Sequence, residues 1–178
     1  MPAALTLITG GGRSGKSRHA LQLAESFQGK KTFIATCPVL DDEMRCRIDR
    51  HRQERVGQGW ITSEEPVQLH RAIARAGSGL VLVDCLTLWV NNLIYDAEKN
   101  GLELSEDDVT RHCVEVLQQL AIFSGVVLLV TNEVGLGIIP ENALARRFVD
   151  LSGRCNQFFA NAAGEVHFMV SGQVLKVK

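Results

Sequence analysis

Residues 5–17, with the sequence LTLITGGGRSGKS, decide the fold of this chain. They fit the pattern G-x-x-x-x-G-K-[ST], with Gly10, Gly15, Lys16 and Ser17 in its fixed positions. The apolar, β-branched run before the glycines predicts a strand, and the pattern after them predicts a helix that begins at Lys16. In that context the glycines let the backbone curl so that successive N–H groups face an anion, and the helix N-terminus adds its positive dipole end. The stretch therefore predicts a phosphate-binding loop, against the alternative of a glycine-rich turn that binds nothing.

Three side chains in and near this loop suit a nucleoside triphosphate with Mg²⁺. Lys16 supplies a point charge to the β- and γ-phosphate oxygens, and the Ser17 hydroxyl can ligate the metal. Asp84 ends the apolar run LVLVD (80–84), and a carboxylate at that strand end can hold Mg²⁺ directly or through water. Asp is also a common helix N-cap, so a cap at the strand exit is the alternative reading of Asp84. The motif indicates the triphosphate but does not specify the reaction.

Strand-like and helix-like segments alternate along the rest of the chain. Strands are predicted at residues 5–9, 31–36, 79–86 and 126–134, with a short strand or an extended loop at 60–66. Helices are predicted at residues 16–27, 41–56, 67–76, 86–96 and 106–123. A last helix is expected to start at Pro140 and to bury Leu144, Phe148, Leu151, Cys155, Phe158 and Ala162, before a hairpin around Ser171 and Gly172. This order predicts an α/β fold of the P-loop NTPase type: a mostly parallel sheet with helices on both faces and a C-terminal antiparallel hairpin.

Composition narrows the class of protein. The chain has 178 residues, 46% hydrophobic and 22% charged, which suits a single domain over residues 1–178. The formal net charge of −1 argues against a nucleic-acid partner, and the apolar runs are too short for a membrane span. The N-terminus lacks the charged start and long apolar run of a signal peptide. Five cysteines, an odd number with no C-x-x-C pair, complete a pattern that predicts a cytoplasmic protein with reduced thiols.

His51 lies among five arginines in the segment RCRIDRHRQER (45–55). Neighbouring cations disfavour the protonated ring, which favours the neutral, nucleophilic imidazole. The arginines also suit the phosphates of a nucleotide and the charge that develops during an in-line displacement. The segment therefore suits attack by His51 on phosphorus, whereas the alternative is a solvated, charged helix with a bystander histidine. The other four histidines lack such neighbours and are expected to be structural or surface residues.

Polar residues follow two further strands. Thr131, Asn132 and Glu133 end the fourth strand, where ligands of open α/β sheets gather, so they are candidates to orient the substrate or the attacking oxygen. They are equally good turn formers. Residues 63–65, SEE, can accept hydrogen bonds from a base or ribose, or form a solvated turn.

Five segments distributed over nearly the whole chain resemble a known family. They are TGGGRSGKSRHA (9–20), FIATCPVLDDEMRCRIDRHRQER (33–55), LVDCLTLWVNNL (82–93), LVTNEVGLGIIPENALARRFVDLSGRCNQ (129–157) and VSGQVLKVK (170–178). Together they are similar to the bifunctional adenosylcobinamide kinase / adenosylcobinamide-phosphate guanylyltransferase family of cobalamin biosynthesis. The second and fourth segments are the most distinctive.

The resemblance implies two reactions. The family phosphorylates the hydroxyl of the aminopropanol arm of adenosylcobinamide with a nucleoside triphosphate, ATP or GTP. It then takes GMP from GTP onto a histidine, releases pyrophosphate and passes GMP to the new phosphate, which gives adenosyl-GDP-cobinamide. The resemblance further implies a fold related to recombination ATPases and assembly as a homotrimer.

The resemblance also implies which residues act. The GMP-carrying histidine corresponds to His51, and Lys16 is the catalytic lysine of the phosphate loop. Nucleotide contacts correspond to Gly10, Gly11, Gly12, Arg13, Ser14, Gly15, Lys16, Ser17, Ala35, Thr36, Cys37, Arg52, Gln53, Glu54, Arg55, Glu64 and Asp84. Ser17 and Asp84 remain the expected Mg²⁺ ligands.

Two positions depart from some relatives. Arg50 stands where some relatives have a first of two adjacent histidines, which leaves His51 as the single candidate nucleophile in this segment. Cys37 replaces a serine, so a backbone contact to nucleotide survives there but a hydroxyl contact does not. Two alternative functions stay open on the sequence: a small-molecule kinase in which His51 is inert, and a nucleotide-switch ATPase module.

Overall fold

The structure is a computed structural model that describes residues 3–38, 49, 52–53 and 55–178. Within these residues the strands form one sheet in the order β3-β2-β4-β5-β1-β6-β7. The strands are β1 (Ala4–Gly10), β2 (Lys31–Ala35), β3 (Trp60–Glu64), β4 (Ser78–Asp84), β5 (Ser124–Val130), β6 (Glu165–Val170) and β7 (Gln173–Lys176). All neighbouring pairs are parallel except β6 and β7, which form the antiparallel hairpin at one edge. The predicted mostly parallel sheet is confirmed.

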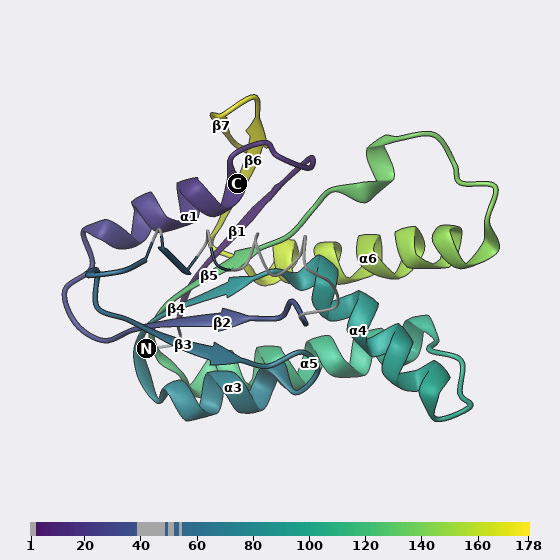
Figure 1. Ribbon diagram of the computed structural model, residues 1–178, viewed down its shortest axis with the longest axis horizontal. Helices are drawn as coiled ribbons and strands as arrows, with labels where there is room; N and C mark the ends of the chain where they lie inside the picture. The colour runs from purple at the N-terminus through teal and green to yellow at the C-terminus, as the bar shows by residue number, and fades with distance from the viewer. Residues whose placement is uncertain (1–2, 39–48, 50–51, 54) are drawn as a thin grey trace.

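Helices cover both faces of this sheet (Figure 1). They are α1 (Lys16–Glu25), α3 (Leu69–Ala76), α4 (Leu86–Lys99), α5 (Glu106–Ile122) and α6 (Ala143–Ala162), with a short 3₁₀ turn η1 (Val134–Leu136) before α6. Among the helices that the structure describes, α1 alone lies on one face, where Ala20 and Ala24 pack on Ile8, Leu82 and Leu128. The other four helices lie on the opposite face. The described helices include none that is both long and apolar enough to cross a bilayer.

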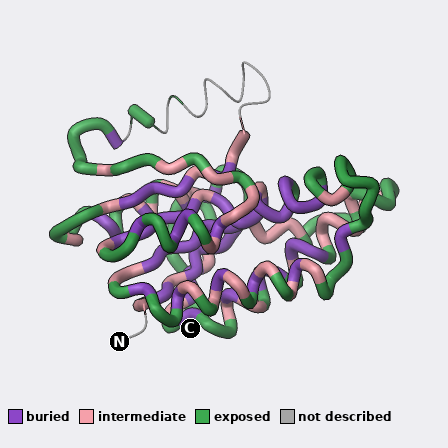
Figure 2. The backbone as a smooth tube through the Cα atoms, turned by 90° about the horizontal axis from the view of Figure 1, so that it is seen from below, coloured by how far each residue is buried: buried purple, intermediate pink, exposed green. Residues whose placement is uncertain are grey.

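The core follows from strands that are apolar on both sides. In β4 the residues Leu80, Val81, Leu82 and Val83 are all buried, because alternate side chains point to the two helix layers. Buried segments run through the middle of the molecule in Figure 2, whereas exposed segments form the outer helical turns and loops. The larger core cluster lies under α3 to α6 and includes Trp89, Phe123 and Phe159.

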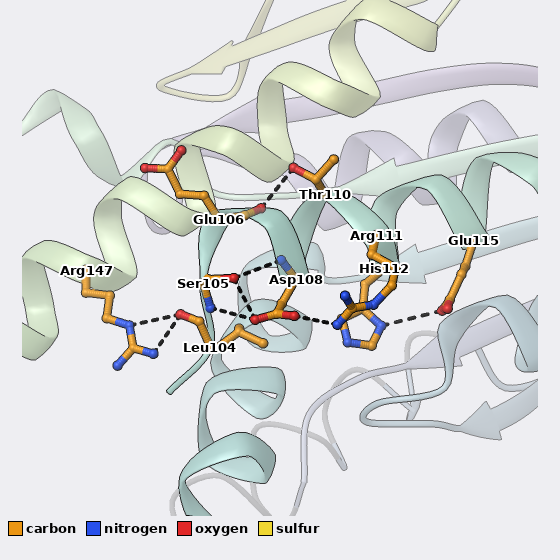
Figure 3. A network of polar contacts seen from close by, with 9 residues as sticks. All are labelled: Leu104, Ser105, Glu106, Asp108, Thr110, Arg111, His112, Glu115 and Arg147. Atoms are coloured by element: carbon orange, nitrogen blue, oxygen red, sulfur yellow. Dashed lines mark hydrogen bonds and ion pairs between the residues drawn. The ribbon is translucent and has the colours of Figure 1, made fainter. Parts of the chain in front are cut away.

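The start of α5 shows how local sequence sets a helix boundary (Figure 3). The Ser105 hydroxyl accepts a hydrogen bond from the Asp108 backbone N–H at 3.1 Å, and the Asp108 carboxylate accepts one from the Ser105 N–H at 3.0 Å. This reciprocal capping box pairs two N–H groups that the helix itself leaves unsatisfied. The Ser105 hydroxyl also donates to the Asp108 carboxylate at 2.6 Å, and this bond, the bond from the Ser105 N–H and the Arg111 guanidinium hold the pKa of Asp108 well below its ordinary value.

The structure corrects two sequence predictions for α6. The helix does not begin at Pro140, because Asn142 is the N-cap and its side-chain oxygen accepts from the Ala145 N–H at 3.0 Å. The predicted apolar face is also shifted: Leu144 is 49% exposed and Ala162 is exposed, whereas Phe159 is fully buried. The face that packs on the sheet includes the polar residues Ser152 and Asn156, which an apolar pattern does not reveal.

Candidate active site

The phosphate loop connects β1 to α1 and is shaped by two glycines. Gly10 has a φ of 147°, and a Cβ atom there would lie 2.4 Å from the Met169 carbonyl oxygen of β6. Gly15 has a φ of 98° and is the N-cap of α1. The hairpin turn between β6 and β7 packs behind the loop, since the Gly172 N–H donates to the Ser14 carbonyl at 3.0 Å. The β6–β7 hairpin is therefore part of the support of the predicted phosphate loop.

Lys16 and Ser17 occupy the first turn of α1, as the motif predicts. Lys16 is buried, and its Nζ donates to the Gly11 carbonyl at 2.5 Å, so the ammonium lies over the loop. Ser17 is partly exposed in the same turn. The arrangement brings a cation, backbone N–H groups and a helix N-terminus to one place, which suits the oxygens of a polyphosphate.

Strand register brings three further predicted contact residues into one row. Ala35 of β2 pairs with Glu64 of β3 on one side and with Asp84 of β4 on the other. The Thr36 N–H then donates to the Asp84 carbonyl at 3.2 Å. Parallel strands end at the same edge, so residues from sequence positions 35, 64 and 84 lie beside one another at the carboxyl edge of the sheet, where the phosphate loop also begins.

A buried asparagine, which the sequence analysis missed, secures this edge. Asn92 of α4 donates through Nδ2 to the Thr36 carbonyl at 2.7 Å and to the Pro66 carbonyl at 3.0 Å. The Thr36 hydroxyl donates to the Cys85 carbonyl and accepts from the Cys85 N–H, both at 2.7 Å. The one available signal was an amide within the mostly apolar first half of α4, with Trp89 three residues before it.

Cys85 itself is not poised as a nucleophile. Burial, reinforced by the neighbouring Asp84 carboxylate, raises the pKa of its thiol to about 12. The thiol therefore stays protonated at neutral pH, and only the thiolate is strongly nucleophilic.

The basic segment is described only in part. His51 and Glu54 lie outside the described residues, so their predicted roles stay predictions. Gln53 is exposed, and Arg52 is half-exposed and forms an ion pair with Glu64 of β3. Arg55 is buried, with its guanidinium carbon 3.5 Å from the centroid of the Phe33 ring. The chain thus places Arg52 at the strand-end row, whereas Arg55 packs against the α1 face of β2.

The donor set at this edge fits Mg²⁺. Ser17 and Asp84 offer a hydroxyl and a carboxylate oxygen, and both residues are partly exposed. Hard oxygen ligands of this kind are those that Mg²⁺ prefers, and Mg²⁺ bound with a nucleotide takes its remaining ligands from phosphate and water. These two residues would hold the metal.

Two histidines join α1 to β6 beside the phosphate loop. His19 Nε2 lies 3.0 Å from His167 Nδ1, and His167 Nε2 lies 3.2 Å from the Glu165 carboxylate. Partial burial, and the neighbouring His167 to a smaller extent, lower the pKa of His19 below 6.5. The predicted structural role of these histidines agrees with this position between two elements of the core.

We expect His19 to make the protein less stable as the pH falls below neutrality. Because the pKa of His19 is lower in the folded than in the unfolded chain, the unfolded chain binds the proton first. The stabilisation is fully present above about pH 6.5 and is lost as the pH falls from there toward the folded pKa. Urea unfolding at about pH 7.5 and about pH 5.5 measures the difference, which should be smaller in His19→Gln than in wild type. An unchanged difference in the variant would remove His19 as the cause.

Comparison with known proteins gives a family match over nearly the whole chain. Residues 6–177 match the family model CobU, described as cobinamide kinase / cobinamide phosphate guanyltransferase. The bifunctional adenosylcobalamin biosynthesis protein CobU of Escherichia coli K12 is 40% identical over 182 residues, covering 98% of this chain and 99% of that protein. The bifunctional adenosylcobalamin biosynthesis protein CobP of Pseudomonas aeruginosa is 41% identical over 175 residues, covering 97% of this chain and 96% of that protein.

A distant solved structure supports the fold alone. An ATPase from the type III secretion system of pathogenic bacteria superposes with a TM-score of 0.58 at 10% identity, covering 94% of this chain and 51% of that one. This likeness confirms the predicted P-loop ATPase architecture.

The family model matches nearly the whole sequence, and the alignment at 40% identity with the Escherichia coli relative also covers nearly the whole sequence. The chain belongs to the cobinamide kinase / cobinamide phosphate guanyltransferase family.

Proposed function

We propose that this chain phosphorylates adenosylcobinamide with ATP or GTP and then transfers GMP from GTP to the product, giving adenosyl-GDP-cobinamide and pyrophosphate. The observation that carries the proposal is the phosphate loop at the sheet edge where Ala35, Glu64 and Asp84 stand in register. The family membership supplies the substrate class. Residues 1–178 act as one domain in this proposal, since a single sheet takes strands from Ala4 through Lys176.

In the kinase reaction the chain positions the triphosphate and stabilises charge. Residues 10–17 surround the phosphates with backbone N–H groups, and Lys16 lies where its ammonium can neutralise charge on the transferred group. Mg²⁺, held by Ser17 and Asp84, supplies further neutralisation of the phosphate oxygens when it is bound. Ala35, Thr36, Cys37 and Glu64 line the adjoining edge as nucleotide contacts, and Asn92 holds that edge in place.

In the guanylyl reaction His51 is the nucleophile. A neutral ring nitrogen attacks the α-phosphorus of GTP, the bond to the β-phosphate oxygen breaks, and pyrophosphate leaves. The phosphate of adenosylcobinamide phosphate then displaces the histidine and forms the new pyrophosphate link. Arg52, Gln53, Glu54 and Arg55 contact the nucleotide in this proposal, which the resemblance and the cationic character of the segment support.

GTP labelled at the α-phosphate tests the guanylyl half directly. Wild-type protein should retain label after denaturation, and the adduct should be stable to alkali and labile to acid, as a phosphoramidate is. His51→Ala should take up no label, whereas the matched His70→Ala, a histidine of α3 that faces Glu115, should label as wild type does. Equal labelling of His51→Ala and wild type would contradict the mechanism. Phosphorylation without any labelling of wild type would favour a kinase only, and ATP hydrolysis without corrin binding would favour a nucleotide switch.

The assembly and compartment are proposed on separate observations. A homotrimer is supported by apolar side chains in the loop before α6, where Leu136, Ile138 and Ile139 are 72%, 97% and 79% exposed. Light scattering of the purified protein tests the trimeric assembly.

A cytoplasmic location is supported by Cys85, Cys113 and Cys155, which are buried thiols, as expected in a reducing compartment.

A further inference from the structure

Glu133 follows β5 and lies beside the first residue of the phosphate loop. The chain leaves the sheet at Val130, and the Thr131 N–H donates to the Ile8 carbonyl at 3.0 Å. Two residues later the Glu133 N–H donates to the Gly10 carbonyl, also at 3.0 Å. The backbone of Glu133 is therefore attached to the first glycine of the loop.

A buried polar network sets the direction of the Glu133 side chain. Asn156 of α6 is only 7% exposed, and its Nδ2 donates to the Asn132 carbonyl at 3.0 Å and, in a longer contact of 3.4 Å, to the Glu133 carboxylate. The Asn156 side-chain oxygen accepts from the Thr131 hydroxyl at 2.7 Å, and the Asn132 carbonyl, which can only accept, fixes Nδ2 as the end of the amide that faces Glu133. Thr87 of α4 completes the network by accepting from the Asn132 N–H at 2.6 Å. Such networks hold a side chain in one orientation when their members are satisfied.

The other carboxylates that the structure describes at this edge already have partners or a proposed role. Glu64 is paired with Arg52. Glu65 accepts from the Gln68 N–H at 2.9 Å and from Arg75 at 2.9 Å, and it caps the start of α3. Asp84 is the proposed metal ligand. Of the described residues at this edge, Glu133 is the carboxylate that receives a single side-chain amide and stays partly exposed.

We propose that Glu133 is the general base of the phosphoryl transfer and that Asn156 is its positioning residue. This inference rests on the proposed function. The acceptor hydroxyl of adenosylcobinamide forms a bond from its oxygen to the γ-phosphorus, the bond from that phosphorus to the β-phosphate oxygen breaks, and the nucleoside diphosphate leaves. The hydroxyl proton passes to the Glu133 carboxylate, which later releases it to solvent. The guanylyl transfer needs no such base, because its acceptor is a phosphate oxygen that is already ionised at neutral pH.

Only the phosphoryl transfer needs the base, so measuring both reactions distinguishes a catalytic role of Glu133 from a structural one. In Glu133→Gln, kcat for phosphorylation of adenosylcobinamide should fall by about 10²- to 10³-fold with little change in KM for the nucleotide, the size expected for loss of a general base. Glu133→Gln should still transfer GMP to supplied adenosylcobinamide phosphate, and GTP labelled at the α-phosphate should still label the variant. Glu141→Gln, an exposed glutamate of the same loop, is the matched control and should phosphorylate at the wild-type rate.

Asn156→Leu tests the positioning role. It should lower kcat for phosphorylation by about tenfold or more while leaving KM for the nucleotide and the guanylylation of supplied adenosylcobinamide phosphate unchanged, because the base remains but is less well oriented. Phosphorylation by Glu133→Gln within about threefold of wild type would overturn the proposal, as would an equal loss of both reactions. Absence of phosphorylation by the wild-type protein would instead overturn the proposed function, and this proposal with it.

Discussion

Lys16→Ala is expected to lower kcat/KM for phosphorylation of adenosylcobinamide by about 10²- to 10³-fold, the effect of removing one preorganised electrostatic group. Lys16 is buried in the first turn of α1, and its ammonium lies over the loop at 2.5 Å from the Gly11 carbonyl. Alanine leaves the loop glycines and the helix N-terminus intact, so nucleotide can still bind, but the charge on the transferred phosphoryl group loses its cation. Steady-state kinetics with ATP and with GTP measures the loss.

Lys99→Ala is the matched control for charge removal. Lys99 is an exposed lysine in the last turn of α4, and its removal should leave kcat/KM at the wild-type value. Circular dichroism of both variants separates a catalytic defect from a folding defect. Wild-type kinetics in Lys16→Ala would contradict the assignment of residues 10–17 as the phosphate loop.

Gly125→Ala is expected to reduce the free energy of unfolding by about 3 kcal/mol or more, at the upper end of overpacking effects. Gly125 of β5 has a φ of 148°, and a Cβ atom there would lie 1.9 Å from the Gly79 carbonyl oxygen of β4. The obstacle is backbone in a paired strand, so it cannot rotate away as a side chain would. Urea unfolding followed by circular dichroism measures the change.

Gly101→Ala is the control that isolates the steric part of the free-energy loss expected for Gly125→Ala. Gly101 has a φ of 71°, and apart from its chain neighbours no atom of the described residues lies within 4 Å of the Cβ position. Its substitution should therefore cost only the backbone strain, about 1–2 kcal/mol. Equal losses in the two variants would show that contact with Gly79 contributes nothing.

Much of the fold could be predicted from local patterns. The phosphate loop, the continuous apolar run of β4 and the hairpin around Gly172 are signalled by residues close together in the sequence. The start of α6 could not be placed, because Pro140 suits a helix start but Asn142 makes the cap that the structure uses. The buried face of α6 was misplaced for a related reason. Asn156 has a polar side chain, but it is buried because its polar atoms form hydrogen bonds with Thr131 and Asn132.

Sequence by itself determined the class of fold, the phosphate loop and, through its resemblance to a family, the pair of reactions proposed for the chain. Each of these depends on spacing along the chain, which sets backbone curvature and helix and strand period. Only the tertiary structure decided that Glu64, Ala35 and Asp84 share one row, that Gly79 faces Gly125, and that Asn156 contacts Glu133. These contacts join residues far apart in sequence, and strand order and register, which no local pattern encodes, determine them.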